Sequence, residues 1–152
     1  GHGTSLSHSH DQVCGSDNQK NGRIIAVDLS PRCLRELVHL ASLRPGLVPV
    51  LGDARKHSAW GIMVASKVDW LLQDVSQAGQ AEIFINAVKR FLKKGGKGLL
   101  SLKAASERFN EGGEREVFQN VREQLEDAGL TIEEQIDLHG LEDNHCLYFV
   151  TN

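Results

Sequence analysis

Short apolar runs and longer amphipathic segments alternate from one end of the chain to the other. In the longer segments apolar residues recur every three or four positions, which is the period of a helix face, whereas the short runs end at turn-forming or charged residues. This alternation is typical of a mostly parallel sheet with helices on both faces. The pattern therefore predicts an α/β fold.

The pattern also predicts where the elements lie. Strands are expected at residues 24–27, 47–51, 68–73, 99–102, 130–138 and 146–151, and helices at 31–42, 59–65, 80–92 and 117–128. Ser30 and Pro31 supply an N-cap and a first-turn proline for the first of these helices. Pro49 weakens the case for a central strand at 47–51, because proline cannot donate to a ladder. Lys93 to Gly96 indicate the end of the third helix, with cations and a glycine cap.

Length and composition limit the class of protein. The 152 residues suit one domain, and 40% apolar with 24% charged residues is close to the globular average. A net charge of −3 argues against binding nucleic acid through a global positive field. No apolar run is long enough for a membrane span, and the polar start is unlike a signal peptide, so we expect a soluble intracellular protein. Because Gly1 stands where methionine is usual, we expect a preceding segment in the parent protein.

Charged residues follow several of the predicted strands. They are Asp28, Asp53, Asp74 and Lys103. The carboxyl ends of parallel strands meet at one edge of a sheet, and ligands bind at that edge in open α/β folds. Each acid alone could equally be a helix cap or a loop carboxylate. Their shared placement favours a functional site.

A glycine loop opens the chain but departs from the dinucleotide-binding motif. Gly1 and Gly3 match the motif, whereas Leu6 stands where glycine or alanine is needed. The sequence therefore disfavours a nicotinamide cofactor. Asp28 could still bind both ribose hydroxyls of a single nucleoside, an arrangement that suits S-adenosylmethionine, which has no pyrophosphate.

Several segments together resemble fibrillarin. The similar segments are residues 3–8 (the glycine loop), 26–32, 49–55, 74–77, 91–96 and 101–104, with His145 near the end. They follow one register from residue 1 to about residue 150. The resemblance implies a Rossmann-like, S-adenosylmethionine-dependent methyltransferase fold with a C-terminal antiparallel strand. It also implies that residues 1–152 form the methyltransferase domain without the family's first strand and N-terminal domain.

The resemblance further implies methyl transfer to the ribose 2′-hydroxyl of rRNA, with a box C/D guide RNA and a scaffold protein as partners. A Lys, Asp, Lys and His tetrad is proposed for the family, and its last three members correspond to Asp74, Lys103 and His145. The first lysine has no counterpart in these residues. The implied cofactor-binding residues are Gly3, Thr4, Ser5, Asp28, Leu29, Asp53, Ala54, Asp74, Val75 and Gln77. The implied location is the nucleolus, or the cytoplasm of an archaeal cell.

This chain departs from the family at a few positions. Asp28 replaces a glutamate and keeps the carboxylate, Ala78 replaces a proline, and Asn144 replaces an aspartate before the histidine. Two alternative functions remain open. One is a non-catalytic cofactor-binding module that helps assemble a ribonucleoprotein, and the other is a histone glutamine methyltransferase.

Other features have simpler interpretations. A metal site at His8, His10 and Cys14 lacks a fourth ligand, and no metal is expected. The basic run between Lys89 and Lys97 is typical of a solvated helix face. The aromatic residues within apolar runs are expected in the core instead of on a base-stacking surface, and they are Trp60, Trp70, Phe84 and Phe91.

Overall fold

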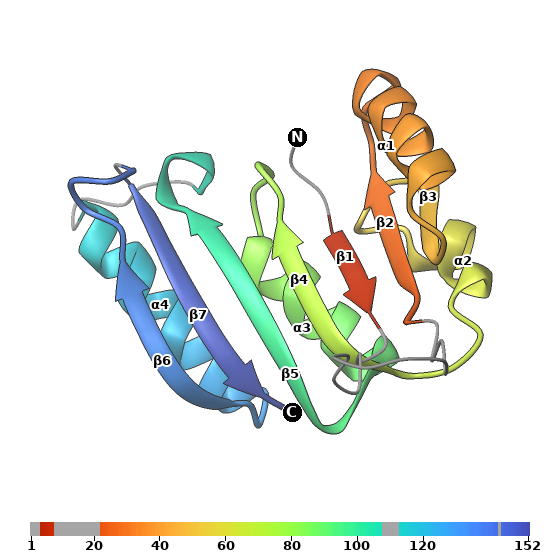
Figure 1. The fold of residues 1–152 in the computed structure, drawn as a ribbon. Helices are drawn as coiled ribbons and strands as arrows, with labels where there is room; N and C mark the ends of the chain where they lie inside the picture. Colours follow the sequence, from red (N-terminus) through yellow and green to blue (C-terminus); the bar gives the residue numbers. More distant parts are fainter. Residues whose placement is uncertain (1–3, 8–21, 108–112, 143) are drawn as a thin grey trace, which may run out of the picture.

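The computed structural model describes residues 4–7, 22–107, 113–142 and 144–152, with the backbone alone at 4–7. Seven strands form one sheet in the order β3-β2-β1-β4-β5-β7-β6 (Figure 1). The strands are β1 (Thr4–Ser7), β2 (Ile24–Asp28), β3 (Leu47–Leu51), β4 (Val68–Asp74), β5 (Leu92–Lys103), β6 (Thr131–Asp137) and β7 (His145–Thr151). The α-helices are α1 (Pro31–Leu43), α2 (His57–Trp60), α3 (Gln80–Phe91) and α4 (Gly113–Asp127), and short 3₁₀ turns are η1 (Gly61–Met63) and η2 (Ala104–Ser106).

Most strands of this sheet run in one direction. The pairings place β2 to β6 parallel to one another in direction, whereas β1 and β7 run the opposite way. The prediction of a mostly parallel sheet with a C-terminal antiparallel strand is therefore confirmed. Connections between parallel strands are right-handed, so α1, which leads outward from β2 to β3, lies on the opposite face from α3, which leads from β4 to β5. In Figure 1 α3 and α4 lie behind the sheet.

The position of β1 was not predicted. The segment expected as a glycine loop forms a short strand between β2 and β4, antiparallel to both. Thr4 is paired with Val27 on one side and with Gln73 on the other. The physical reason is that β2 and β4 would otherwise each leave a row of main-chain donors and acceptors unpaired, and an extended segment of either direction satisfies them.

Local sequence signals explain most element boundaries. Ser30 caps α1, its hydroxyl oxygen accepting a 3.4 Å hydrogen bond from the main-chain N–H of Cys33. Pro49 is tolerated because β3 is an edge strand. The expected glycine cap of the third helix is wrong: α3 ends at Phe91, β5 begins at the next residue, and Gly95 lies within that strand with φ of 74°. The segment predicted as a helix at 59–65 is two shorter turns, α2 and η1.

The main core lies between the sheet and the helices α3 and α4. Phe84 and Tyr148 are fully buried there, and the Tyr148 hydroxyl donates a 2.8 Å hydrogen bond to the carbonyl oxygen of Phe118. Burial raises the pKa of this hydroxyl, so it remains protonated and able to donate. Among the described helices none combines the length and the apolar character needed to cross a membrane.

Trp70 corrects one expectation about the core. Trp60, Phe84 and Phe91 are buried as predicted, but Trp70 is 41% exposed. It lies on the sheet face opposite α3, where its ring stacks on Phe149 with the centroids 5.8 Å apart. Strand periodicity predicts that alternate residues share a face, but it cannot show which face other elements cover.

Candidate functional site

The carboxyl edge of the parallel strands brings the three proposed catalytic residues together. Asp74 ends β4 and is in register with Ser101, two residues before Lys103 at the end of β5. Lys103 is in turn paired with His145, the first residue of the antiparallel β7. Paired residues and residues two apart share a face of a sheet. Asp74, Lys103 and His145 therefore lie on one face along one edge.

A cleft of about 340 Å³ opens at the same edge, close to the point where the strand order reverses. This is the position where open α/β sheets bind ligands. The cleft lies between the β2–α1 connection, the end of β3 and the β4–α3 connection. Its lining residues are Val27, Asp28, Leu29, Ser30, Cys33, Gly52, Ala54, Val75, Ser76 and Gln77. Five of the expected cofactor-binding residues are among them, namely Asp28, Leu29, Ala54, Val75 and Gln77.

The carboxylate of Asp28 is held in place by the start of α1. Its Oδ1 accepts a 2.7 Å hydrogen bond from the main-chain N–H of Ser30, and the residue is only 7% exposed. The main-chain carbonyl of Asp28 accepts from the N–H of Gly52, which ties the ends of β2 and β3 together. Gly52 leaves no space for a side chain, because an added Cβ would lie 2.8 Å from the Trp60 ring. The carboxylate is therefore presented to the cleft by a rigid frame.

Asp53 has a different environment from the one expected. Its side chain is 9% exposed and is bound by Arg55, whose Nε and Nη2 atoms donate to the two carboxylate oxygens at 3.0 and 2.8 Å. These hydrogen bonds lower the pKa of Asp53 to about 2. Asp53 does not line the cleft, although its neighbour Ala54 does. Its role at an adenine remains a prediction.

Of the glycine-loop residues at 3–8, the structure describes only the backbone of 4–7. Gly3 lies outside the described residues, as do His8, His10 and Cys14. Thr4 and Ser5 lie in β1, where Thr4 is next to the carboxyl ends of β2 and β4. A loop at this position is not observed among the described residues, and contact of Thr4 and Ser5 with a cofactor remains a prediction.

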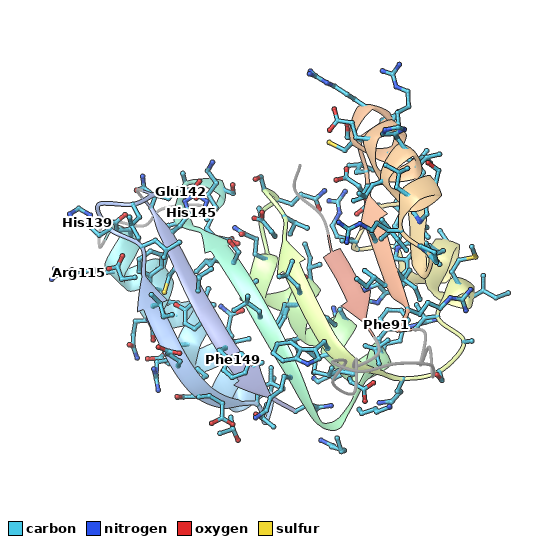
Figure 2. The ribbon with its side chains drawn as sticks, in the orientation of Figure 1. Phe91, Arg115, His139, Glu142, His145 and Phe149 are labelled. Atoms are coloured by element: carbon cyan, nitrogen blue, oxygen red, sulfur yellow. The ribbon has the colours of Figure 1, made fainter. Side chains whose placement is uncertain are left out.

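His145 lies almost buried beside Lys103. It is 4% exposed, and its Nε2 is 3.6 Å from a carboxylate oxygen of Glu142 (Figure 2). The preceding residue, Asn144, adopts a left-handed φ of 63°, and its carbonyl accepts a 2.8 Å hydrogen bond from the N–H of Ala104. Asparagine tolerates this conformation better than most residues. Asn144 is therefore suited to the turn that leads into His145.

Some residues of the site were missed by sequence reasoning. Ser30 and Cys33 line the cleft, and Gln80 and Glu107 hydrogen-bond at the end of β5. The position of Ser30 two residues after a strand-end carboxylate could have indicated its role. Gln80 gave no signal, because a glutamine at the start of a helix is usually exposed.

A half-buried histidine, His57, begins α2 four residues after Asp53. The ring of His57 packs edge-on against Trp60 and Phe91, with centroids 5.3 and 5.1 Å away, and its Nε2 is buried with no hydrogen-bond partner among the residues that the structure describes. Burial, reinforced by the charge of Arg90, lowers the pKa of His57 below its ordinary value of 6.5.

This lowered pKa predicts an acid-sensitive fold. The unfolded chain binds the proton more readily than the folded chain, so the folded state loses stability as the pH falls below about 6.5. Replacing His57 with phenylalanine should flatten that loss, measured by urea unfolding between about pH 8 and about pH 5. The exposed His39→Phe on α1 serves as the control. If the free energy of unfolding changed equally with pH in both variants, the expectation would be contradicted.

The sequence of this chain is similar to those of known proteins. The family model described as Fibrillarin matches residues 1–152. The chain belongs to the fibrillarin family. Among fibrillarin relatives, a "Fibrillarin-like rRNA/tRNA 2′-O-methyltransferase" of Methanocaldococcus jannaschii is 36% identical over 133 residues, which are 88% of this chain and 57% of the relative. The protein of the same name from Thermococcus sibiricus is 39% identical over 148 residues, 97% of this chain and 62% of the relative. The chain thus spans about three fifths of these relatives.

Solved fibrillarin structures share the fold. The Methanococcus jannaschii fibrillarin pre-rRNA processing protein matches with a TM-score of 0.76 and 36% identity, over 84% of this chain and 54% of that one. Aeropyrum pernix fibrillarin, solved with natively bound S-adenosyl-L-methionine, matches with a TM-score of 0.73 and 32% identity, over 85% of this chain and 55% of that one. A fibrillarin in complex with Nop5p matches with a TM-score of 0.77 and 29% identity, over 84% of this chain and 60% of that one. The predicted methyltransferase fold is therefore confirmed.

Proposed function

We propose that this chain binds S-adenosylmethionine in the 340 Å³ cleft and transfers its methyl group to a ribose 2′-hydroxyl of rRNA. The guide is a box C/D RNA, and the partner is a scaffold protein of the Nop5p type. One observation carries the proposal: a fixed carboxylate, Asp28, lines a cleft at the same sheet edge as Asp74, Lys103 and His145. The site of action is the nucleolus in a eukaryotic cell and the cytoplasm in an archaeal one.

The lining of the cleft fits this cofactor. Its volume is within the range of small-molecule sites, and Val27, Leu29 and Val75 supply apolar walls. Asp28 accepts one main-chain hydrogen bond, which leaves acceptor capacity for ribose hydroxyls. The Oε1 of Gln77 is buried with no partner in the described structure, and an ammonium donor of a ligand would satisfy it.

The residues along the edge supply the remaining chemistry. Bound S-adenosylmethionine would provide an electrophilic methyl group on a sulfonium. A ribose hydroxyl is a poor nucleophile, and the amine of Lys103 accepts its proton as the oxygen attacks. The carboxylate of Asp74 orients the amine and the hydroxyl. His145 lies on the neighbouring strand β7, beside Lys103, with its Nε2 3.6 Å from a carboxylate oxygen of Glu142. It is the third polar side chain at this edge of the sheet.

Calorimetric titration with S-adenosylmethionine tests the cofactor. We expect micromolar binding that weakens at least about 10-fold in Asp28→Ala, because hydrogen bonds to a charged group contribute about 1.5–3 kcal/mol each. Asp137→Ala is a matched control: Asp137 also ends a strand and accepts a hydrogen bond from the N–H two residues on, at 3.0 Å, but it lies outside the cleft. Equal weakening in both variants, or no binding by a folded chain, would contradict the proposal.

Methyl incorporation tests the substrate. The chain, supplied with guide RNA and a Nop5p-type scaffold, should label an RNA complementary to the guide and should leave a 2′-deoxy target nucleotide unlabelled. A parallel reaction with histone separates ribose transfer from the glutamine alternative. Labelling of histone alone would refute an RNA substrate, and binding of the cofactor without any labelling would favour a non-catalytic assembly module.

A further inference from the structure

The end of β5 has an unusual hydrogen-bond partner. The ladder between β4 and β5 ends at Asp74 and Ser101, so Lys103 lies two residues beyond the last pair. Its main-chain N–H nevertheless donates to Oε1 of Gln80 at 3.0 Å, and its carbonyl accepts from Nε2 of the same side chain at 2.9 Å. A primary amide offers a donor and an acceptor with the spacing of a peptide group. The side chain of Gln80 thus stands in for the next residue of β4.

Gln80 is itself held from several sides. It is fully buried, and its carbonyl accepts a 2.8 Å hydrogen bond from Nε2 of Gln73, the residue before Asp74. The carboxylate of Glu107 accepts from the N–H of Gly79, the N–H of Gln80 and the Gln80 amide, at 3.0, 2.9 and 3.1 Å. A carboxylate at a helix N-terminus is favoured by the helix dipole. The start of α3 is therefore fixed to both strand ends that carry the proposed site.

This arrangement also sets how Lys103 faces His145. Because the N–H and C=O of Lys103 both bond to Gln80, they point away from β7. The pair with His145 is consequently of the non-hydrogen-bonded kind, in which facing side chains approach most closely. The amide of Gln80 thus fixes the main chain of Lys103, and with it the point from which the lysine side chain extends.

We propose that Gln80 is a positioning residue for methyl transfer, acting through the main chain of Lys103. This inference rests on the proposed function. Gln80 does not line the cleft, so its loss should spare cofactor binding. Small displacements of a reacting group can cost about 100-fold in rate. We therefore expect Gln80 to affect the transfer step alone.

The test compares Gln80→Met, which fills the same volume without the amide, with the unsubstituted chain in the guide-RNA assay. We expect kcat to fall about 100-fold, KM for S-adenosylmethionine to change less than about 3-fold, and amide exchange at Lys103 to accelerate at least about 10-fold. Tyr148→Phe is the control for stability, because it removes one buried hydrogen bond from mid-sheet, away from the site. It should retain kcat.

Several results would overturn the inference. They are an unchanged kcat, an unchanged exchange rate at Lys103, or parallel losses of kcat in Gln80→Met and Tyr148→Phe. If Gln80→Met does not fold, Gln80→Asn replaces it, since the shortened amide keeps polar character but cannot reach Lys103. The amide exchange rate at Lys103 can be measured without any methyl transfer. A chain that transfers no methyl group would therefore refute the proposed function, and the exchange rate would still test whether Gln80 holds the main chain of Lys103.

Discussion

Replacing Lys103 with alanine is expected to reduce methyl transfer by about 100-fold to about 10,000-fold, which is the usual range for loss of a general base. The main chain at this position is held by the amide of Gln80, and the N–H of the next residue, Ala104, donates to the carbonyl of Asn144; neither contact uses the lysine side chain. The variant should therefore fold normally. Lys103 does not line the cleft, so the affinity for S-adenosylmethionine should change less than about 3-fold. Single-turnover labelling and calorimetry on the same preparation measure the two quantities.

A second substitution distinguishes a base from a simple positive charge. Lys103→Arg keeps the cation, but a guanidinium cannot release its proton in the physiological range and so cannot accept one from ribose. It should be as inactive as the alanine variant. Lys94→Ala, an exposed lysine near the other end of the same strand, should retain full activity. Substantial activity in Lys103→Arg, or equal loss of cofactor affinity and rate in Lys103→Ala, would contradict the assignment.

The strands and the site edge could be predicted because their signals are local. The run from Leu47 to Leu51 and the capped helix at Pro31 depend on neighbouring residues, and the structure reproduces both. The positions of Asp74 and Lys103 at strand ends follow from the same runs. A shared edge then follows from the parallel sheet.

The remaining features depend on contacts between distant segments. The direction of β1 is decided by the unpaired edges of β2 and β4, and nothing in its four residues specifies it. The exposure of Trp70 depends on which sheet face the helices cover. The bond from Gln80 to Lys103 joins residues 23 positions apart, and it arises only because β4 stops two residues short of β5. Periodicity contains no information about such endings.

Phe84→Ala is expected to produce the largest loss of stability, about 3–5 kcal/mol, because it removes a fully buried ring from the centre of the core. That is a large fraction of the 5–15 kcal/mol by which domains are usually stable. Chemical denaturation at one pH measures the free energy of unfolding. Ile62→Ala is the matched control, since Ile62 is 88% exposed and its truncation should cost less than about 0.5 kcal/mol.

The ring of Phe84 also explains a glycine in β5. A Cβ on Gly98 would lie 2.8 Å from Cζ of Phe84 and 3.1 Å from Cγ2 of Val150, so Gly98→Ala should destabilise the chain by about 1–3 kcal/mol through overpacking. In the Phe84→Ala background the cavity receives the added methyl group, and most of this penalty should vanish. The two substitutions should therefore be non-additive by at least about 1 kcal/mol. Additivity within about 0.5 kcal/mol would show that contact with the Phe84 ring is not the cause, and would leave Val150 or the strand backbone to account for the cost.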